Sequence, residues 1–325
     1  MRFIEFIERG RVAGLCMALM VTMTPASAAA AAKQAKAQVG DFPPATVALV
    51  GGTFINDALL NSSGILKGSF TVKTRVGTSP VIWYAETDGV SFYYVHMHGE
   101  GHYVETWAAL AQLGVREAIG GATAGGINRA MKLYDYVVPT DFIDMNISRP
   151  LAMPIEAYPD PDKIPIPRYV PAMDPLLQKI LIDETRSAIR ASHDYDDIGL
   201  HEQGVVIQSR GGRFETAAEV RMMGEWGADL VTMSIGTEMT YARMMGINYA
   251  ALVSISNPAE GVGAWEWETL KQVYPRINPL SLRIVLAAIP KAAAIPAGTP
   301  RVGDALRFHP EMTSEPATDS KKVLP

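Results

Sequence analysis

The stretch "ATVALVGGTF", residues 45–54, joins an unbroken apolar run to a glycine pair and a threonine. Such a run is typical of a buried strand in an α/β sheet. The glycines let backbone N–H groups approach an anion, and Thr53 adds a hydroxyl at the same place. The stretch predicts a central strand ending in a candidate anion site, although a glycine pair after a strand is more often only a turn.

Apolar runs and helical patterns alternate through most of the remaining chain. Further strands are expected within residues 90–99, 116–128, 134–144, 204–209, 228–234 and 248–257. Helices are expected within 108–115, 175–193, 215–227, 237–246 and about 266–293. This alternation predicts a single three-layer α/β domain over residues 44–295, with the loops at the strand ends forming the site.

The first 28 residues have the pattern of a cleavable signal peptide. Basic residues precede the apolar run "VAGLCMALMVTM" (12–23), and small residues follow it. A membrane anchor is the alternative, but about twelve apolar residues are too few to span a bilayer. We therefore expect a periplasmic or secreted protein with no stable membrane span after processing. Residues 29–43 are expected to form a linker and 296–325 a flexible tail.

Composition limits the classes of partner and the catalytic chemistry that we expect for this chain. The formal net charge of −5 gives no support for nucleic acid binding through a basic face. Cys16, the single cysteine, lies inside the signal segment, so the mature chain would have no disulfide and no thiol nucleophile.

Four more motifs follow predicted strands. The segment "GATAGGIN" (121–128) is a second glycine-rich strand end, and "SISNPAEG" (254–261) places Asn257 at another. In "RGGRFETAAE" (210–219), Glu215 lies near a helix N-terminus, where the dipole favours a carboxylate; simple helix capping is the alternative. In "MSIGTE" (233–238), Ser234 is available to a ligand and Thr237 is a candidate N-cap.

The order of these motifs resembles the nucleoside phosphorylase superfamily over about residues 45–290. The likeness is to its trimeric branch of purine nucleoside, methylthioadenosine and methylthioinosine phosphorylases. It rests on "GGT", "HG…H", "AGGIN", "FETAAE", "WGAD", "MSIGTE", "ARMMGINYA" and "NPAEG", in that order. The resemblance implies a mixed central sheet flanked by helices, a homotrimer, a purine nucleoside substrate, inorganic phosphate as co-substrate and no cofactor.

The resemblance also assigns roles to individual residues. The phosphate-binding positions correspond to Thr53, Ser234, His98 and Thr123. The ribose and base positions correspond to Ala124, Met233 and Phe214. The catalytic candidates are Asn257 and Glu215, which match the pair that grips the purine edge, and His102.

The residue at position 257 bears on which purine is used. An asparagine amide can donate to a 6-oxo group, whereas the aspartate of a methylthioadenosine-type site cannot. Glu215 would accept the N1–H, which adenine lacks. Asn257 therefore favours hypoxanthine or guanine over adenine as the base.

The phosphate corner departs from the family pattern. Where related enzymes carry a phosphate-binding arginine, the candidate positions hold Met97 and Glu100. Arg210 or Arg213 could replace the missing charge, but solvated loop positions are the alternative. Two other functions therefore stay open. One is hydrolysis, with Glu100, Glu105 or His102 as the general base; the other is a catalytically silent nucleoside-binding protein.

Three histidines, His96, His98 and His102, fall within seven residues. Two of them on one strand face, with the third or a neighbouring glutamate, could chelate zinc. The resemblance needs no metal and already matches His98 and His102 to family histidines. We therefore expect no metal site and a structural role for His96.

Overall fold

The computed structural model describes residues 40–55, 57–98, 101–146, 149–150, 152–158, 164 and 167–301. The signal peptide, most of the linker and residues 302–325 lie outside these ranges. Within them, no helix combines the length and hydrophobicity needed to cross a bilayer.

The described strands and helices follow the predicted alternation, with an added group of strands between residues 66 and 87. The strands are β1 Val47–Gly51, β2 Leu66–Phe70, β3 Lys73–Thr74, β4 Gly77–Thr78, β5 Ile82–Thr87, β6 Val90–His96, β7 Glu117–Gly126, β8 Tyr136–Val137, β9 Asp141–Asp144, β10 Leu200–His201, β11 Val205–Gln208, β12 Leu230–Thr232 and β13 Asn248–Pro258. The α-helices are α2 Asp57–Ser63, α3 Tyr103–Gln112, α4 Pro175–Arg190, α5 Ala217–Glu225, α6 Ile235–Met244 and α7 Trp267–Ala293.

The main sheet is mixed, as the resemblance implies. Its principal order is β10-β8-β13-β7-β1-β6-β5-β2. Strands β13, β7, β1 and β6 run parallel to one another, whereas β5 is antiparallel to β6 and β2 to β5. Strand β12 pairs antiparallel with the end of β7 and leads on to β11 and β9.

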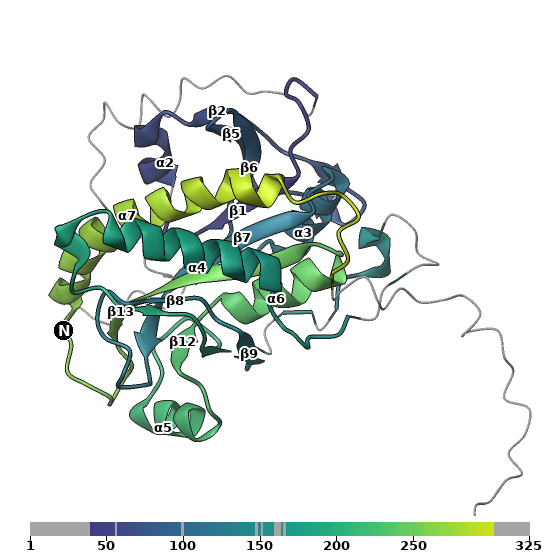
Figure 1. The fold of residues 1–325 in the computed structure, drawn as a ribbon. Helices are drawn as coiled ribbons and strands as arrows, with labels where there is room; N and C mark the ends of the chain where they lie inside the picture. Colours follow the sequence, from purple (N-terminus) through teal and green to yellow (C-terminus); the bar gives the residue numbers. More distant parts are fainter. Residues whose placement is uncertain are drawn as a thin grey trace, which may run out of the picture.

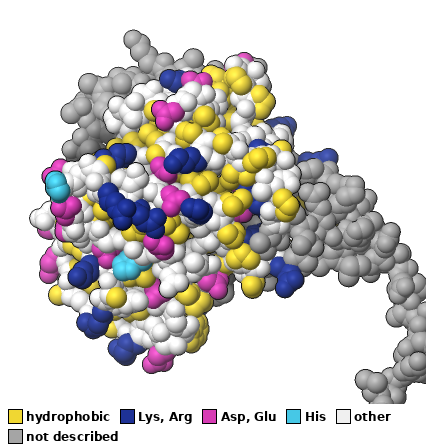
Figure 2. Space-filling view, in the orientation of Figure 1, with side chains coloured by type: hydrophobic (Ala, Val, Ile, Leu, Met, Phe, Trp, Pro, Cys, Tyr) yellow, Lys and Arg dark blue, Asp and Glu magenta, His cyan; other side chains and the backbone are white. Residues whose placement is uncertain are grey.

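The three predicted layers are present (Figure 1). Helices α4 and α7 lie side by side across one face of the sheet, and α3 and α6 cover the other. Strand β1 shows why, because its residues alternate between the two cores: Val47 and Leu49 pack toward α4 and α7, and Ala48 and Val50 toward α3 and α6. On the face seen in Figure 2, basic side chains are interspersed with acidic ones.

The pairing of β7 changes partners along its length. Strand β1 pairs with β7 only as far as Ile119, and β12 takes over at Gly125 and Gly126. Because β12 is antiparallel, its carboxyl end runs back toward the carboxyl end of β1. The segment of β7 between them carries Thr123, so the two strand ends and Thr123 surround one opening in the sheet.

Two local predictions are wrong. Helix α6 begins at Ile235, so Thr237 is not its N-cap; it is fully buried, and its N–H donates to Gln208 Oε1 at 2.6 Å. The stretch 134–144 is not one strand but two, β8 and β9. Pro139 separates them because it has no N–H to continue a ladder, and the two strands pair in different parts of the sheet.

Both ends of the described chain pack on the domain. Phe42, within the expected linker, stacks on Tyr84 with ring centroids 4.3 Å apart. Arg301, within the expected tail, is buried: its guanidinium contacts Glu117 Oε1 at 3.0 Å and also the Asp174 carboxylate. Packing therefore extends beyond both edges of the predicted 44–295 domain.

The ion cluster of Glu117, Asp174 and Arg301 should make stability depend on pH. Burial raises the pKa of Glu117 to about 7, because Arg301 offsets only part of the cost and Asp174 adds a second negative charge. The folded-state pKa thus exceeds the ordinary value of 4.5. The stabilisation from a protonated Glu117 is complete below about pH 4.5 and is lost as the pH rises through about 7.

We therefore expect the free energy of unfolding to fall over this range, and Glu117→Gln to flatten the fall. Urea denaturation at several pH values measures both. An unchanged pH dependence in the variant would contradict the assignment to Glu117.

Candidate active site

A hydroxyl cluster lies at the opening between β1 and β12. The Thr53 Oγ1 accepts hydrogen bonds from the Thr123 N–H at 3.2 Å and the Thr123 hydroxyl at 2.9 Å. Helix α7 reaches the same place: Asn278 Nδ2 donates to the Thr53 carbonyl at 3.3 Å, and the Tyr274 hydroxyl hydrogen bonds to Thr123. The exposed Thr53 is thus held from two sides, with its surface open to a ligand.

His98 lies beside this cluster and is fixed by a buried carboxylate. Its Nδ1 faces the Thr53 N–H at 3.4 Å, and its Nε2 lies 2.8 Å from Glu238 Oε1. The Tyr249 hydroxyl donates to the other oxygen of Glu238 at 2.6 Å. A Cβ at Gly52 would lie 1.8 Å from His98 Nδ1, so the imidazole occupies space that only glycine leaves.

The start of α6 provides a second polar group at the opening. Ser234 is the N-cap residue, yet its side chain makes no capping hydrogen bond. The first N–H groups and the dipole of a helix attract an anion at this position. Met233 precedes it and lies beneath the loop at Gly211, where an added Cβ would be 3.7 Å from the methionine sulfur.

Glu215 is not a helix cap, which was the alternative role. Helix α5 is capped by a complete capping box of Thr216 and Glu219. Arg213 pairs with Glu219, at 2.7 and 2.8 Å, so it does not supply the missing phosphate charge. Glu215 itself is buried, and its Oε1 has no hydrogen-bond partner among the described residues. A buried carboxylate oxygen without a donor is suited to receive one from a ligand.

Asn257 is oriented by a β-bulge. The register of β13 against β7 shifts between Ile255 and Asn257, which makes Ser256 the extra residue. The Ser256 hydroxyl donates to Asn257 Oδ1 at 2.8 Å, and Asn257 Nδ2 donates to the Pro258 carbonyl at 2.9 Å. The amide oxygen is therefore satisfied internally, and the second N–H of Nδ2 remains for a ligand.

Two further predicted residues lie on the same loops and strands. Phe214 makes an edge contact with Trp265, their ring centroids 5.2 Å apart. Ala124 is buried, and its carbonyl lies 3.3 Å from the Ser256 hydroxyl, which ties β7 to the bulge.

The remaining candidates are not drawn into this group. His102 precedes α3, its side chain is 54% exposed, and its Nδ1 lies 4.0 Å from Glu105 Oε2. Arg210 is exposed. Met97, one of the two candidate positions for the family arginine, is buried in the core, and Glu100, the other, lies outside the described residues. In the part of the chain that is described, no three histidine, cysteine or acidic side chains gather as a metal site.

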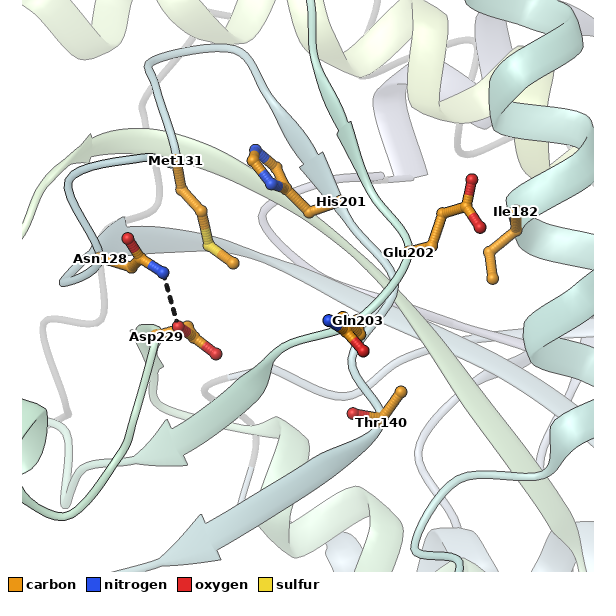
Figure 3. Close-up of a pocket in the computed structure, with 8 residues that line it drawn as sticks. All are labelled: Asn128, Met131, Thr140, Ile182, His201, Glu202, Gln203 and Asp229. Atoms are coloured by element: carbon orange, nitrogen blue, oxygen red, sulfur yellow. Dashed lines mark hydrogen bonds between the residues drawn. The ribbon is translucent and has the colours of Figure 1, made fainter.

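A separate cavity of about 610 Å³ contains none of these residues (Figure 3). Several of its polar groups are already paired. Asp229 accepts hydrogen bonds from Asn128 Nδ2 at 2.8 Å and from the Val205 N–H, and His201 Nε2 lies 2.8 Å from Asp135. The unsatisfied Glu215 oxygen and the oriented Asn257 instead favour the sheet opening as the ligand site.

Sequence reasoning missed four polar residues that support the site: Tyr274, Asn278, Ser256 and Glu238. Tyr274 and Asn278 are four residues apart, so they share one face of α7. That spacing was a visible signal, although the prolines of "YPRINP" obscure it. No local pattern could have joined Glu238 to His98, because 140 residues separate them.

Together, the fold and the site define an α/β protein with a small-molecule site at the carboxyl ends of its strands. The sequence matches the family described as the Phosphorylase superfamily over residues 68–290, which is more than half of its length, and the chain belongs to that superfamily.

Individual relatives agree with this assignment. The 6-oxopurine nucleoside phosphorylase of Pyrococcus furiosus is 29% identical over 266 residues, covering 75% of this chain and 92% of that protein. The S-methyl-5′-thioadenosine phosphorylase of Anopheles gambiae is 26% identical over 271 residues, covering 77% and 90%.

Solved structures show the same fold. A methylthioadenosine phosphorylase from an antarctic soil metagenomic library superposes with a TM-score of 0.69 at 22% identity, covering 81% of this chain and 91% of that one. The methylthioadenosine phosphorylase of Schistosoma mansoni gives a TM-score of 0.63 at 21% identity, covering 77% and 92%.

The contact between Gly52 and His98 predicts the effect of one methyl group. Gly52→Ala should displace the imidazole and leave the buried Glu238 short of a donor. An unsatisfied buried group typically costs about 1–3 kcal/mol, measurable as a lower free energy of unfolding in urea. Gly224→Ala is the control, because its Cβ would meet only the Ile127 side chain, at 3.3 Å. Equal stability of the two variants would contradict the predicted clash.

Proposed function

We propose that this protein is a purine nucleoside phosphorylase, a pentosyltransferase that cleaves the N-glycosidic bond with inorganic phosphate. The products are the free base and ribose 1-phosphate or its 5′-substituted analogue. The observation that carries the proposal is the unsatisfied, buried Oε1 of Glu215, in the loop that also carries Phe214. The names of the relatives, both 6-oxopurine and methylthioadenosine phosphorylases, support the same reaction class.

The site residues match the charge changes of the reaction. Breaking the N-glycosidic bond leaves positive charge on the sugar and negative charge on the departing base. The free N–H of Asn257 would donate to N7 or O6, and Glu215 would accept the N1–H. A preorganised donor aimed at developing charge contributes about 3–4 kcal/mol in comparable sites.

Phosphate would bind on the other side of the ribose. Thr53, Ser234 and the N-terminus of α6 offer hydroxyl and N–H donors; Thr123 orients the Thr53 hydroxyl, and His98 borders them. Met233 would line the ribose. No cofactor is required, since phosphate itself is the nucleophile.

A 6-oxopurine is the proposed base. The bulge at Ser256 supports this choice, because the serine hydroxyl satisfies the oxygen of Asn257 and leaves the amide to act as a donor. A donor is complementary to the 6-oxo group of hypoxanthine or guanine and not to the 6-amino group of adenine.

Hydrolysis is the second candidate, and one observation favours it. One of the two positions expected to hold the phosphate arginine carries Met97, which is buried in the core. Bidentate guanidinium is the strongest side-chain partner of phosphate. A site without it could admit water instead, and His102 would then be a candidate general base.

Three further properties belong to the proposal. The basic, apolar and small-residue segments at 1–28 support export to the periplasm or outside the cell. The resemblance to the trimeric branch supports a homotrimer. The formal net charge of −5, with acidic and basic side chains interspersed on the face seen in Figure 2, supports small-molecule partners rather than nucleic acid.

An assay with and without phosphate tests the reaction. Purified protein is incubated with inosine, guanosine or methylthioinosine, and released base is measured. We expect release only with phosphate. Equal release without it would establish hydrolysis, and tight nucleoside binding without turnover would identify a silent binding protein.

Replacing the amide tests the base assignment. Asn257→Asp should lower kcat/KM for inosine by roughly 10²–10³-fold, because it removes the donor to the leaving base. Asn61→Asp in α2 is the matched control and should leave kcat/KM unchanged. Unaltered inosine cleavage by Asn257→Asp would rule out the proposed contact.

A further inference from the structure

Glu238 is a buried carboxylate to which the proposed reaction gives no direct role. It is fully buried on α6, one turn beyond Ser234. Burial, strengthened by the Glu238 charge, raises the pKa of Tyr249 well above its ordinary value, so the phenol stays protonated and donates. Glu238 therefore accepts hydrogen bonds on both oxygens, from Tyr249 and from His98.

This arrangement fixes the tautomer of His98. Because Nδ1 accepts a hydrogen bond from the Thr53 N–H, the proton of the neutral imidazole lies on Nε2, which donates to Glu238 Oε1. The Nδ1 lone pair then faces the Thr53 N–H, across a long contact of 3.4 Å. Nδ1 is thus a weakly satisfied acceptor that faces the backbone of Thr53, the residue whose hydroxyl belongs to the cluster where phosphate would bind.

One carboxylate, that of Glu238, faces His98, so it can balance one positive charge on the imidazole. Glu238 faces it from α6, Tyr249 stands behind Glu238 on β13, and Thr53 faces it from the end of β1. Tyr103 of α3 contributes only to the field at Tyr249. Within the described ranges, His98 is the single basic side chain that pairs with Glu238.

We propose that Glu238 is a positioning residue that makes phosphate binding proton-coupled, an inference that rests on the proposed function. Dihydrogen phosphate displaces the Thr53 N–H from His98 Nδ1 and donates one proton to it: one P–O–H bond breaks and one N–H bond forms. The resulting imidazolium lies between the Glu238 carboxylate and monohydrogen phosphate. It provides the positive charge that Met97 cannot, and Glu238 compensates its burial.

Two glycines show that the fold is built around this chain of groups. A Cβ at Gly120 would lie 2.0 Å from the Tyr249 hydroxyl and 2.6 Å from Glu238 Oε2. A Cβ at Gly52 would enter the imidazole of His98. A side chain at Gly52 or at Gly120 would therefore displace one of these hydrogen-bonded groups.

Titration calorimetry with inorganic phosphate tests the inference. At about pH 8 free phosphate is mostly the dianion, so proton-coupled binding must take up protons from the buffer. The number of protons follows from repeating the titration in buffers of different ionisation enthalpy. We expect net uptake by the unaltered protein. Glu238→Gln should abolish it and weaken phosphate binding at least about tenfold.

Controls separate this effect from general destabilisation. Glu117→Gln removes another buried carboxylate, at the opposite end of β7, and should retain uptake and affinity. Phosphate binding without proton uptake by the unaltered protein would overturn this inference and leave phosphorolysis standing. The same holds if a folded Glu238→Gln variant keeps both uptake and affinity. Absence of any phosphate binding by the unaltered protein would overturn both.

Discussion

The structure depends on the absence of side chains in the middle of β7. At Gly120 a Cβ would enter Tyr249 and Glu238 on one face of the sheet; at Gly121 it would lie 2.3 Å from the Leu252 carbonyl and 2.7 Å from the ring of Phe54. Neighbouring groups therefore approach the backbone of β7 from both sides. Phe54, the residue after Thr53, packs against Gly121, and Glu238, the partner of His98, packs against Gly120. The two glycines therefore let Glu238 and Phe54, which adjoin the candidate site, pack directly against the backbone of β7.

The candidate site combines polar residues suited to a purine base, Glu215 and Asn257, with an apolar residue, Met97, at one of the positions expected to hold a phosphate-binding arginine. Glu215 and Asn257 keep their polar groups free or oriented, through a capping box and a bulge that belong to the backbone. Of the two positions in the phosphate corner at which the resemblance would place an arginine, the one at Met97 is buried in the core. What remains there is a set of neutral donors, one helix dipole and one imidazole. The electrostatics of this corner therefore depend on His98 to an unusual degree.

Much of the fold was visible in the sequence because strand ends, glycines and apolar runs are local features. The buried run at 45–54 and the long final helix were both predicted closely. The failures arise where tertiary contacts override local pattern. Thr237 has the residue type of an N-cap but is recruited by Gln208, 29 positions earlier.

The same distinction between local motifs and long-range contacts applies to the candidate site. Glu215 and Asn257 lie in recognisable motifs at strand ends, whereas Asn278 and Glu238 reach the site from helices. Their contacts, to Thr53 and His98, span 225 and 140 residues. No periodicity encodes contacts of that separation.

The burial of Arg301 has a consequence for how the chain acquires its structure. Its partner Glu117 begins β7, and 184 residues separate the two. A ribosome releases the chain from its N-terminus, so every strand of the sheet leaves it before Arg301 does. Until then Glu117 and Asp174 lack the guanidinium that pairs with both of them in the folded domain. The ion pairs of Arg301 can therefore form only after all of the strands have been synthesised.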